Sequence, residues 1–179
     1  MKPEQITEFW FHKKGPREWF FSKRPELDAL IRRKFLKTYE AVVRGETADW
    51  RKTPRGRLAE IIVLDQFSRN MFRGTPEMYR YDSLALALAQ EAIRVGADKR
   101  LTKNERMFMY LPFEHSESRK IQKQSVKLFK TIWGKEWMKY AIDHKRIVGR
   151  FGRFPHRNKI LGRKSTFAEK KFMQKHKGY

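Results

Sequence analysis

The segment from Pro54 to Met71 constrains the fold most, because it has the pattern of a helix with apolar residues on two sides. At about 100° per residue, Leu58 and Ile62 fall on one face, whereas Leu64 and Phe67 fall on a second. A helix that presents apolar residues to both sides must be covered on both sides. The pattern therefore predicts a central helix in a helical protein.

Two charged residues interrupt the first of these apolar faces. Asp65 and Arg69 are four residues apart, so their side chains meet on the helix surface. A buried charge without a partner costs several kcal/mol, so we expect each of them to be paired. Asn70 and Arg73 follow on the same segment, and we expect the helix to end at Arg73 and Gly74.

The other helices follow from apolar periodicity and from signals at helix ends. Pro25 in a first helical turn, together with the capping-box sequences TKNE and TFAE, marks three helix starts. An aromatic loop, residues 19–21, is expected to be buried. We predict helices over residues 3–13, 25–44, 54–71, 77–95, 102–111, 116–133, 135–148 and 166–174. No segment has a convincing strand pattern.

These segments predict an all-α protein. The 179 residues are expected to form one domain, an array of about seven antiparallel helices, in which residues 170–179 form a frayed basic tail.

A second informative stretch runs from Arg150 to Thr166 and contains no carboxylate. It carries four arginines, one histidine and one asparagine: Arg150, Arg153, Arg157, Arg163, His156 and Asn158. Glycines and a proline make one continuous helix unfavourable here, so we expect an irregular loop. Arginine forks on such a loop can bind a phosphate or carboxylate of a ligand, or they can pair with acids of the same fold. The sequence leaves both interpretations open.

Three residues are candidates for catalysis: His115, Glu117 and Asp65. His115 and Glu117 lie at the expected start of a helix and can act as an acid and base pair. They can equally cap that helix or pair with residues 150–166, here called the arginine loop. We favour these two structural roles over the catalytic one. His144 falls on an apolar helical face, as core histidines do. No spacing of histidines and carboxylates predicts a metal site, and no motif predicts a cofactor.

Charge and composition limit the function further. The chain has 42 Lys plus Arg against 20 Asp plus Glu, a net charge of +22, and no cysteine. Such a field attracts nucleic acid non-specifically and small anionic metabolites as well. The absence of cysteine and of an apolar run long enough to cross a membrane favours a cytoplasmic protein. No pattern fixes an oligomeric state.

Three motifs give the chain a resemblance to a known family: LDQFSRNMFRGTP (64–76), LPFEHSE (111–117) and RFGRFPHRNKILGRKST (150–166). They resemble the bacterial DUF924 family, which has no established activity. The resemblance implies an all-helical, tetratricopeptide-like superhelix. The positions that match family motifs are Asp65, Gln66, Arg69, Asn70, Arg73, His115, Glu117, His144, Arg150, Arg153, His156, Arg157 and Asn158. Ile121 departs from the family, which usually has an acidic residue there.

The residues and the resemblance together lead to three functional hypotheses. The first is a small anionic or phosphate-bearing ligand held by Arg69, Asn70, Arg73, Arg150, Arg153, His156, Arg157 and Asn158. The second is a hydrolase or transferase that uses His115, Glu117 or Asp65. The third is an RNA- or peptide-binding module driven by the basic surface.

Overall fold

The computed structural model describes residues 1–11, 24–132 and 135–176, and these residues form helices and turns with no strand. The predicted aromatic loop at residues 19–21 lies outside them. Contacts divide the chain into two compact units. Unit 1 comprises residues 1–73 and 77–112, and unit 2 comprises residues 74–76 and 113–179. The all-helical prediction is confirmed.

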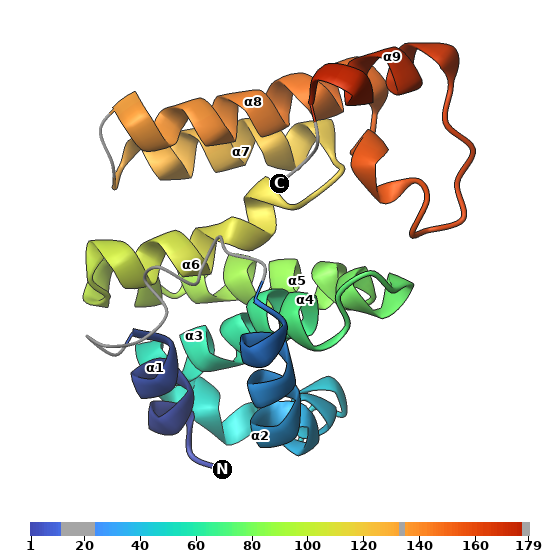
Figure 1. Ribbon diagram of the computed structural model, residues 1–179. Coiled ribbons are helices and arrows are strands. Elements are labelled where there is room, and N and C mark those ends of the chain that lie inside the picture. Colours follow the sequence, from blue (N-terminus) through green and yellow to red (C-terminus); the bar gives the residue numbers. More distant parts are fainter. Residues whose placement is uncertain (12–23, 133–134, 177–179) are drawn as a thin grey trace. The chain divides into compact units, whose positions relative to one another are not determined.

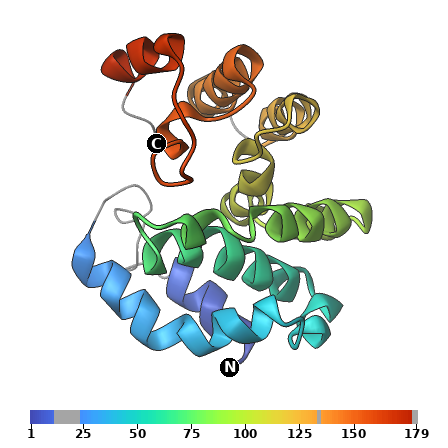
Figure 2. The same ribbon diagram turned by 90° about the vertical axis from the view of Figure 1, so that its right-hand side faces the viewer.

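Unit 1 is built around α3, which contacts α1, α5 and the short helix η2 (Figure 1). The long helix α2, light blue in Figure 2, contacts α4 and the segment η3. The elements are α1 (Pro3–Phe11), α2 (Pro25–Val43), η2 (Ala48–Lys52), α3 (Pro54–Ile62), η3 (Val63–Phe67), α4 (Ser68–Met71), η4 (Pro76–Tyr79), α5 (Asp82–Arg94), η5 (Ala97–Arg100) and α6 (Lys103–Glu114).

The predicted central helix is present. Leu58, Ile62 and Phe67 are fully buried, and Leu64 is 1% exposed, so apolar side chains on both sides are covered. The helix is not regular, because η3 is a π-helical turn between α3 and α4. A π-turn widens the helix by one residue per turn and shifts the faces that follow. Regular 100° periodicity could not predict this shift.

Several predicted helix boundaries are wrong. α7 ends at Lys130 rather than residue 133, and α8 ends at Phe151 rather than residue 148. α5 begins at Asp82 rather than residue 77, because Pro76–Tyr79 forms a separate 3-10 turn. α6 continues to Glu114, past Pro112. Only two residues follow this proline in the helix, so the lost N–H and the ring affect only the last turn. α7 begins after Ser118 rather than at Ser116.

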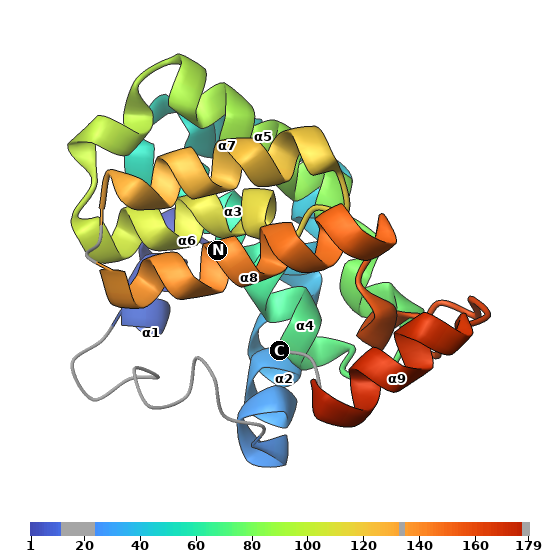
Figure 3. The same ribbon diagram turned by 90° about the horizontal axis from the view of Figure 1, so that it is seen from above.

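Unit 2 consists of an antiparallel helix pair and a loop that returns to it. Its elements are α7 (Arg119–Lys130), α8 (Lys135–Phe151), η6 (Pro155–Arg157) and α9 (Phe167–Lys175). α7 and α8 lie side by side in Figures 1 and 3, as a short connection favours. Phe154, from the loop, packs with Ile147 and Val148 in a small core. The arginine loop is irregular, as predicted, although Arg150 belongs to α8.

Several predicted helix-end signals are confirmed. Thr102 with Glu105, and Thr166 with Glu169, form both reciprocal hydrogen bonds of a capping box. Gly96 adopts a left-handed φ of 70° after α5, where a residue with a side chain would be strained. α9 extends to Lys175 and so includes part of the segment expected to fray. Among the described residues, no helix is long and apolar enough to cross a membrane.

Candidate functional site

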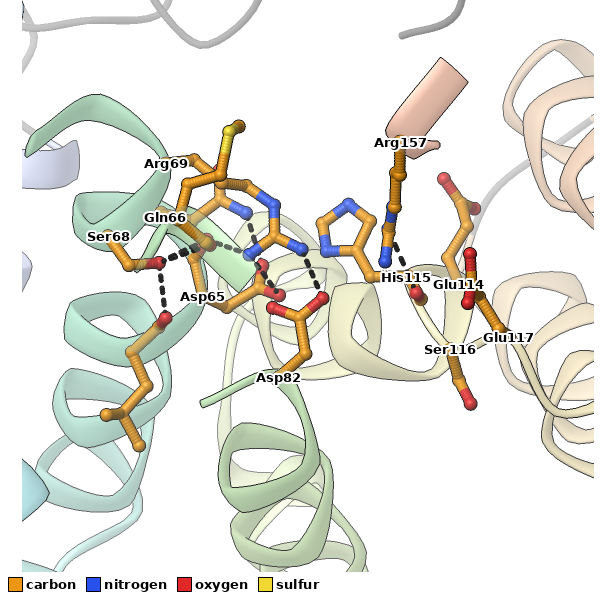
Figure 4. A network of polar contacts seen from close by, with 12 residues as sticks. Asp65, Gln66, Ser68, Arg69, Asp82, Glu114, His115, Ser116, Glu117 and Arg157 are labelled. Carbon is orange, nitrogen blue, oxygen red and sulfur yellow. Dashed lines mark hydrogen bonds and ion pairs between the residues drawn. The ribbon is translucent and has the colours of Figure 1, made fainter. Parts of the chain in front are cut away.

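In unit 1, the predicted pair of Asp65 and Arg69 is present and has a third member. Arg69 Nη1 lies 3.2 Å from Asp65 Oδ1, and Nη2 donates to Asp82 Oδ2 at 2.9 Å (Figure 4). Asp65 comes from the π-turn η3, and Asp82 is the first residue of α5. The guanidinium therefore connects two elements of unit 1.

Burial and charge act in opposite directions on this arginine. Burial alone lowers the pKa of Arg69, but the charges of Asp65 and Asp82 outweigh it and hold the pKa above its usual value. The guanidinium carbon lies 5.5 Å from the centre of the Tyr79 ring, a cation–π distance. The cluster is thus an ion network with two carboxylates for one cation.

Asn70 and Arg73, also predicted as ligand-binding residues, bond to α2. Asn70 Nδ2 donates to Asp28 Oδ1 at 2.7 Å, and Arg73 binds both oxygens of the same carboxylate at 2.6 and 2.9 Å. This bidentate geometry fixes α4 and the residues after it against α2. In this arrangement the two side chains serve the packing of unit 1.

In unit 2, the arginine loop is tied to the start of α9 by one ion pair. Arg153 binds Glu169 in bidentate fashion at 2.7 and 3.1 Å and donates to the Lys164 carbonyl. Glu169 is 2% exposed and closes the capping box of α9 with Thr166. The hydrogen bond from Arg153 lowers the pKa of Glu169 to about 2.

A second ion pair ties the loop to the connection before α7. The Glu117 carboxylate accepts hydrogen bonds from Nη1 and Nη2 of Arg163, at 2.7 and 2.9 Å. It also accepts one from the backbone N–H of Phe154, at 2.8 Å. Burial raises the pKa of Glu117, but these hydrogen bonds outweigh burial and leave the pKa below its usual value. An ionised carboxylate held this way stabilises the loop, and it would have to leave Arg163 to accept a proton.

Arg157 lies between Arg153 and Arg163 in the sequence and is 7% exposed. Its Nη2 donates to the backbone carbonyl of His115 at 3.0 Å, and Figure 4 shows the side chain pointing toward that carbonyl. The guanidinium carbon lies 4.6 Å from the centre of the Phe154 ring. A carbonyl dipole and an aromatic face both stabilise a buried guanidinium, and the negative charge of Glu117 interacts with it as well.

Burial and nearby positive charge lower the pKa values of two imidazoles. Burial lowers the pKa of His156 to about 4, and the positive charge of Arg157 adds to the effect. Burial likewise lowers the pKa of His144 to about 3, although its hydrogen bond with the Tyr140 carbonyl acts against burial. His144 also lies 3.5 Å from buried Glu114. Both imidazoles are therefore neutral at pH 7.

The predicted site residues belong to both units. Asp65 and Arg69 pair in unit 1, whereas His115, Glu117, His156 and Arg157 belong to unit 2. Arg150 is exposed over the Phe151 ring, and buried Asn158 donates to Ser165. Within the described ranges, no three His, Asp or Glu side chains are arranged to hold a metal ion.

Sequence reasoning missed the acidic partners. Asp82, Asp28, Glu114 and Glu169 each bind a predicted residue. The available signal for Glu169 was its place in the TFAE capping box, which we assigned to α9 alone. For Asp28 and Asp82, sequence separations of 42 and 13 residues from their partners left no local signal.

Comparison with known proteins places this chain in a family without assigning its chemistry. The model of "Bacterial protein of unknown function (DUF924)" matches residues 6–177. A solved structure of a protein of unknown function from Agrobacterium tumefaciens, ATU0120, is similar with 38% identity, a TM-score of 0.91 and coverage of 97% of each chain. No curated protein matches. The chain therefore belongs to the DUF924 family of bacterial proteins, and its helical structure is shared with a solved relative.

Proposed function

We propose that unit 2 binds the phosphate or carboxylate group of a small anionic molecule beside Arg157. The observation that carries this proposal is a buried guanidinium next to His156, an imidazole kept neutral at pH 7. The charge of Arg157 lowers the pKa of His156, so an anion between them would stabilise both the guanidinium and a protonated imidazole. His115 and Asn158, which lie next to Arg157 in space and in sequence respectively, complete the polar surroundings.

The flanking ion pairs support this assignment by fixing the loop before any ligand arrives. Arg153 with Glu169, and Arg163 with Glu117, are both bidentate. Their forks are occupied by carboxylates of the same unit, so the proposal gives them a positioning role. A pre-organised loop loses little conformational entropy on binding, which favours affinity for a small ligand.

The direct test is thermal stability against a panel of inorganic phosphate, phosphorylated metabolites, nucleotides and carboxylates, at about 150 mM salt so that diffuse attraction is screened. A ligand at about 100 times its Kd stabilises the folded state by about 2.7 kcal/mol. We expect one chemical class to raise the Tm of the parent and of Lys159→Gln, and not of Arg157→Gln.

Lys159→Gln is the matched control, because it removes one positive charge from an exposed position of the same loop. Arg157→Lys serves as a second variant that keeps the charge and loses the fork. If every polyanion raised the Tm of all four proteins alike, the net charge would be the cause and the proposal would be wrong.

The tetratricopeptide-like superhelix implied by the family resemblance also stays a proposal. The antiparallel contact of α7 with α8 across a short connection supports it, because such repeats are built from pairs of this kind. A crystal structure tests it. Successive helix pairs related by a nearly constant rotation would agree with a superhelix, and irregular rotations would contradict it.

A further inference from the structure

Helix α7 presents a row of lysines to solvent, here called the lysine row: Lys120, Lys123, Lys127 and Lys130. All four are exposed, and their spacing of three or four residues places them within an arc of about 80° along about 15 Å of helix. The opposite face is buried in unit 2 through Gln122, Ser125 and Phe129. The row is therefore held by a packed helix and points outward.

The charge of the lysine row is not balanced within unit 2. Residues 113–179 hold 19 basic and 5 acidic residues, a net charge of +14, whereas the 112 residues before them carry +8. The carboxylates of this unit that the structure describes are bound elsewhere: Glu114 lies against His144, Glu117 binds Arg163, Asp143 binds Arg146 and His176, and Glu169 binds Arg153.

We infer that the lysine row binds the phosphate backbone of single-stranded RNA without sequence preference. Lysine ammonium groups neutralise phosphates as point charges, and a row along one helix follows one backbone rather than two. The apolar face of α7 is buried in its own unit, so it cannot insert into a membrane. Lysine is depleted at protein–protein interfaces, which makes an acidic protein a poorer match.

The test compares two variants that lose the same four charges from different places. The row variant is Lys120→Gln, Lys123→Gln, Lys127→Gln and Lys130→Gln. The control variant is Arg33→Gln, Lys37→Gln, Lys99→Gln and Lys103→Gln, all exposed residues of unit 1. Glutamine keeps a high helix propensity, and far-ultraviolet circular dichroism checks folding. Binding of a fluorescent 20-nucleotide poly(U) RNA is measured by anisotropy between about 50 and 200 mM salt.

Each phosphate contact to a single strand contributes about 0.7 to the slope of log K against log salt. The row variant should therefore lower the slope by about 3, so that the parent loses about 50-fold more affinity than the row variant over this salt range. The control variant should keep the slope of the parent. The variant with only Lys123→Gln and Lys127→Gln should show about half of the effect.

Two results would overturn the inference. Equal loss of slope in the row and control variants would show attraction to the net charge, with no defined surface. RNA displaced equally well by poly-glutamate or by phosphatidylserine vesicles would assign the row to another anionic partner. Because no residue of the row belongs to the site proposed beside Arg157, either proposal can fail while the other stands.

Discussion

At the scale of single residues, the arginines of one loop have different roles because they meet different partners. Arg153 and Arg163 bind carboxylates in bidentate fashion, whereas Arg157 contacts a carbonyl and an aromatic ring. A bidentate carboxylate neutralises the guanidinium that it binds, whereas a carbonyl dipole and a ring contact stabilise a guanidinium without adding a negative charge. This difference separates the residues that hold the loop from the residue that we propose binds a ligand.

The loop-holding role of Glu117 gives a stability prediction. Glu117→Gln keeps an acceptor for the Phe154 N–H but loses the ion pair with Arg163, which is about one quarter exposed on each side. We expect the free energy of unfolding to fall by about 2 kcal/mol, between the values for exposed and buried pairs. Chemical denaturation monitored by tryptophan fluorescence measures this change in the free energy of unfolding.

An exposed pair provides the control for this change. Asp49 and Lys52 form an ion pair of 2.7 Å with side chains 87% and 78% exposed. Asp49→Asn should leave the denaturation midpoint unchanged. If Glu117→Gln also left the denaturation midpoint unchanged, the ion pair of Glu117 with Arg163 would not stabilise the loop.

At the scale of elements, the sequence predicts well what depends on neighbours in the chain and poorly what depends on distant contacts. The buried faces of α3 and the two capping boxes follow from local spacing. The π-turn at Val63–Phe67 does not, because a single widened turn changes no local signal. The displaced start of α5 depends on a 3-10 turn, and Pro76 fits a 3-10 turn as well as an α-helix.

The candidate site divides in the same way. The pairing of Asp65 with Arg69 was predictable, because both lie on one helix face. Pairing of Glu117 with the arginine loop was one of three alternatives, beside a helix cap and a catalytic role. Its partner Arg163 lies 46 residues away, so the sequence could not identify it. The lowered pKa of His156 could not be predicted, because it depends on burial in the folded protein.

The packing of α3 against η2 gives a paired glycine prediction. A Cβ at Gly56 would lie 1.9 Å from the carbonyl oxygen of Trp50, a backbone atom that cannot move away alone. Gly56→Ala should therefore destabilise the protein by about 2–3 kcal/mol. Gly149, exposed inside α8, meets nothing within 4 Å, so Gly149→Ala should stabilise it by about 0.5–1 kcal/mol. Thermal denaturation of both variants measures their difference in stability. Equal effects of Gly56→Ala and Gly149→Ala would contradict the close contact of Gly56 with the Trp50 carbonyl.

At the scale of the molecule, charge is distributed unevenly, and unit 2 holds most of the excess. Unit 2 also contains two histidines with lowered pKa values and, in buried Glu169, an ionised carboxylate beside an arginine. This combination makes the stability of the protein depend on pH.

The lowered pKa values of His144, which is buried, and of His156, which is partly buried, predict a loss of stability in acid. In the unfolded chain they take up protons near pH 6.5, whereas in the fold their pKa values are about 4 for His156 and about 3 for His144. The unfolded state therefore binds more protons below pH 6.5, and stability falls as pH falls from there to about 4. Each histidine contributes a loss of about 2 kcal/mol between pH 7 and pH 5.

Urea denaturation at pH 7 and pH 5 tests this window. His156→Gln should remove about half of the loss that the histidines cause, because glutamine does not titrate. An unchanged pH dependence in the variant would mean that His156 is charged or exposed in the folded protein.

The central claim, an anion site beside Arg157, is tested most directly by NMR titration of the His156 imidazole with and without saturating inorganic phosphate, at constant ionic strength. Without phosphate, the pKa should be about 4. Phosphate bound between Arg157 and His156 should raise the pKa by at least about one unit, and Arg157→Gln should abolish the phosphate dependence. A His156 pKa that phosphate leaves unchanged, or that phosphate raises equally in Arg157→Gln, would contradict the proposed site.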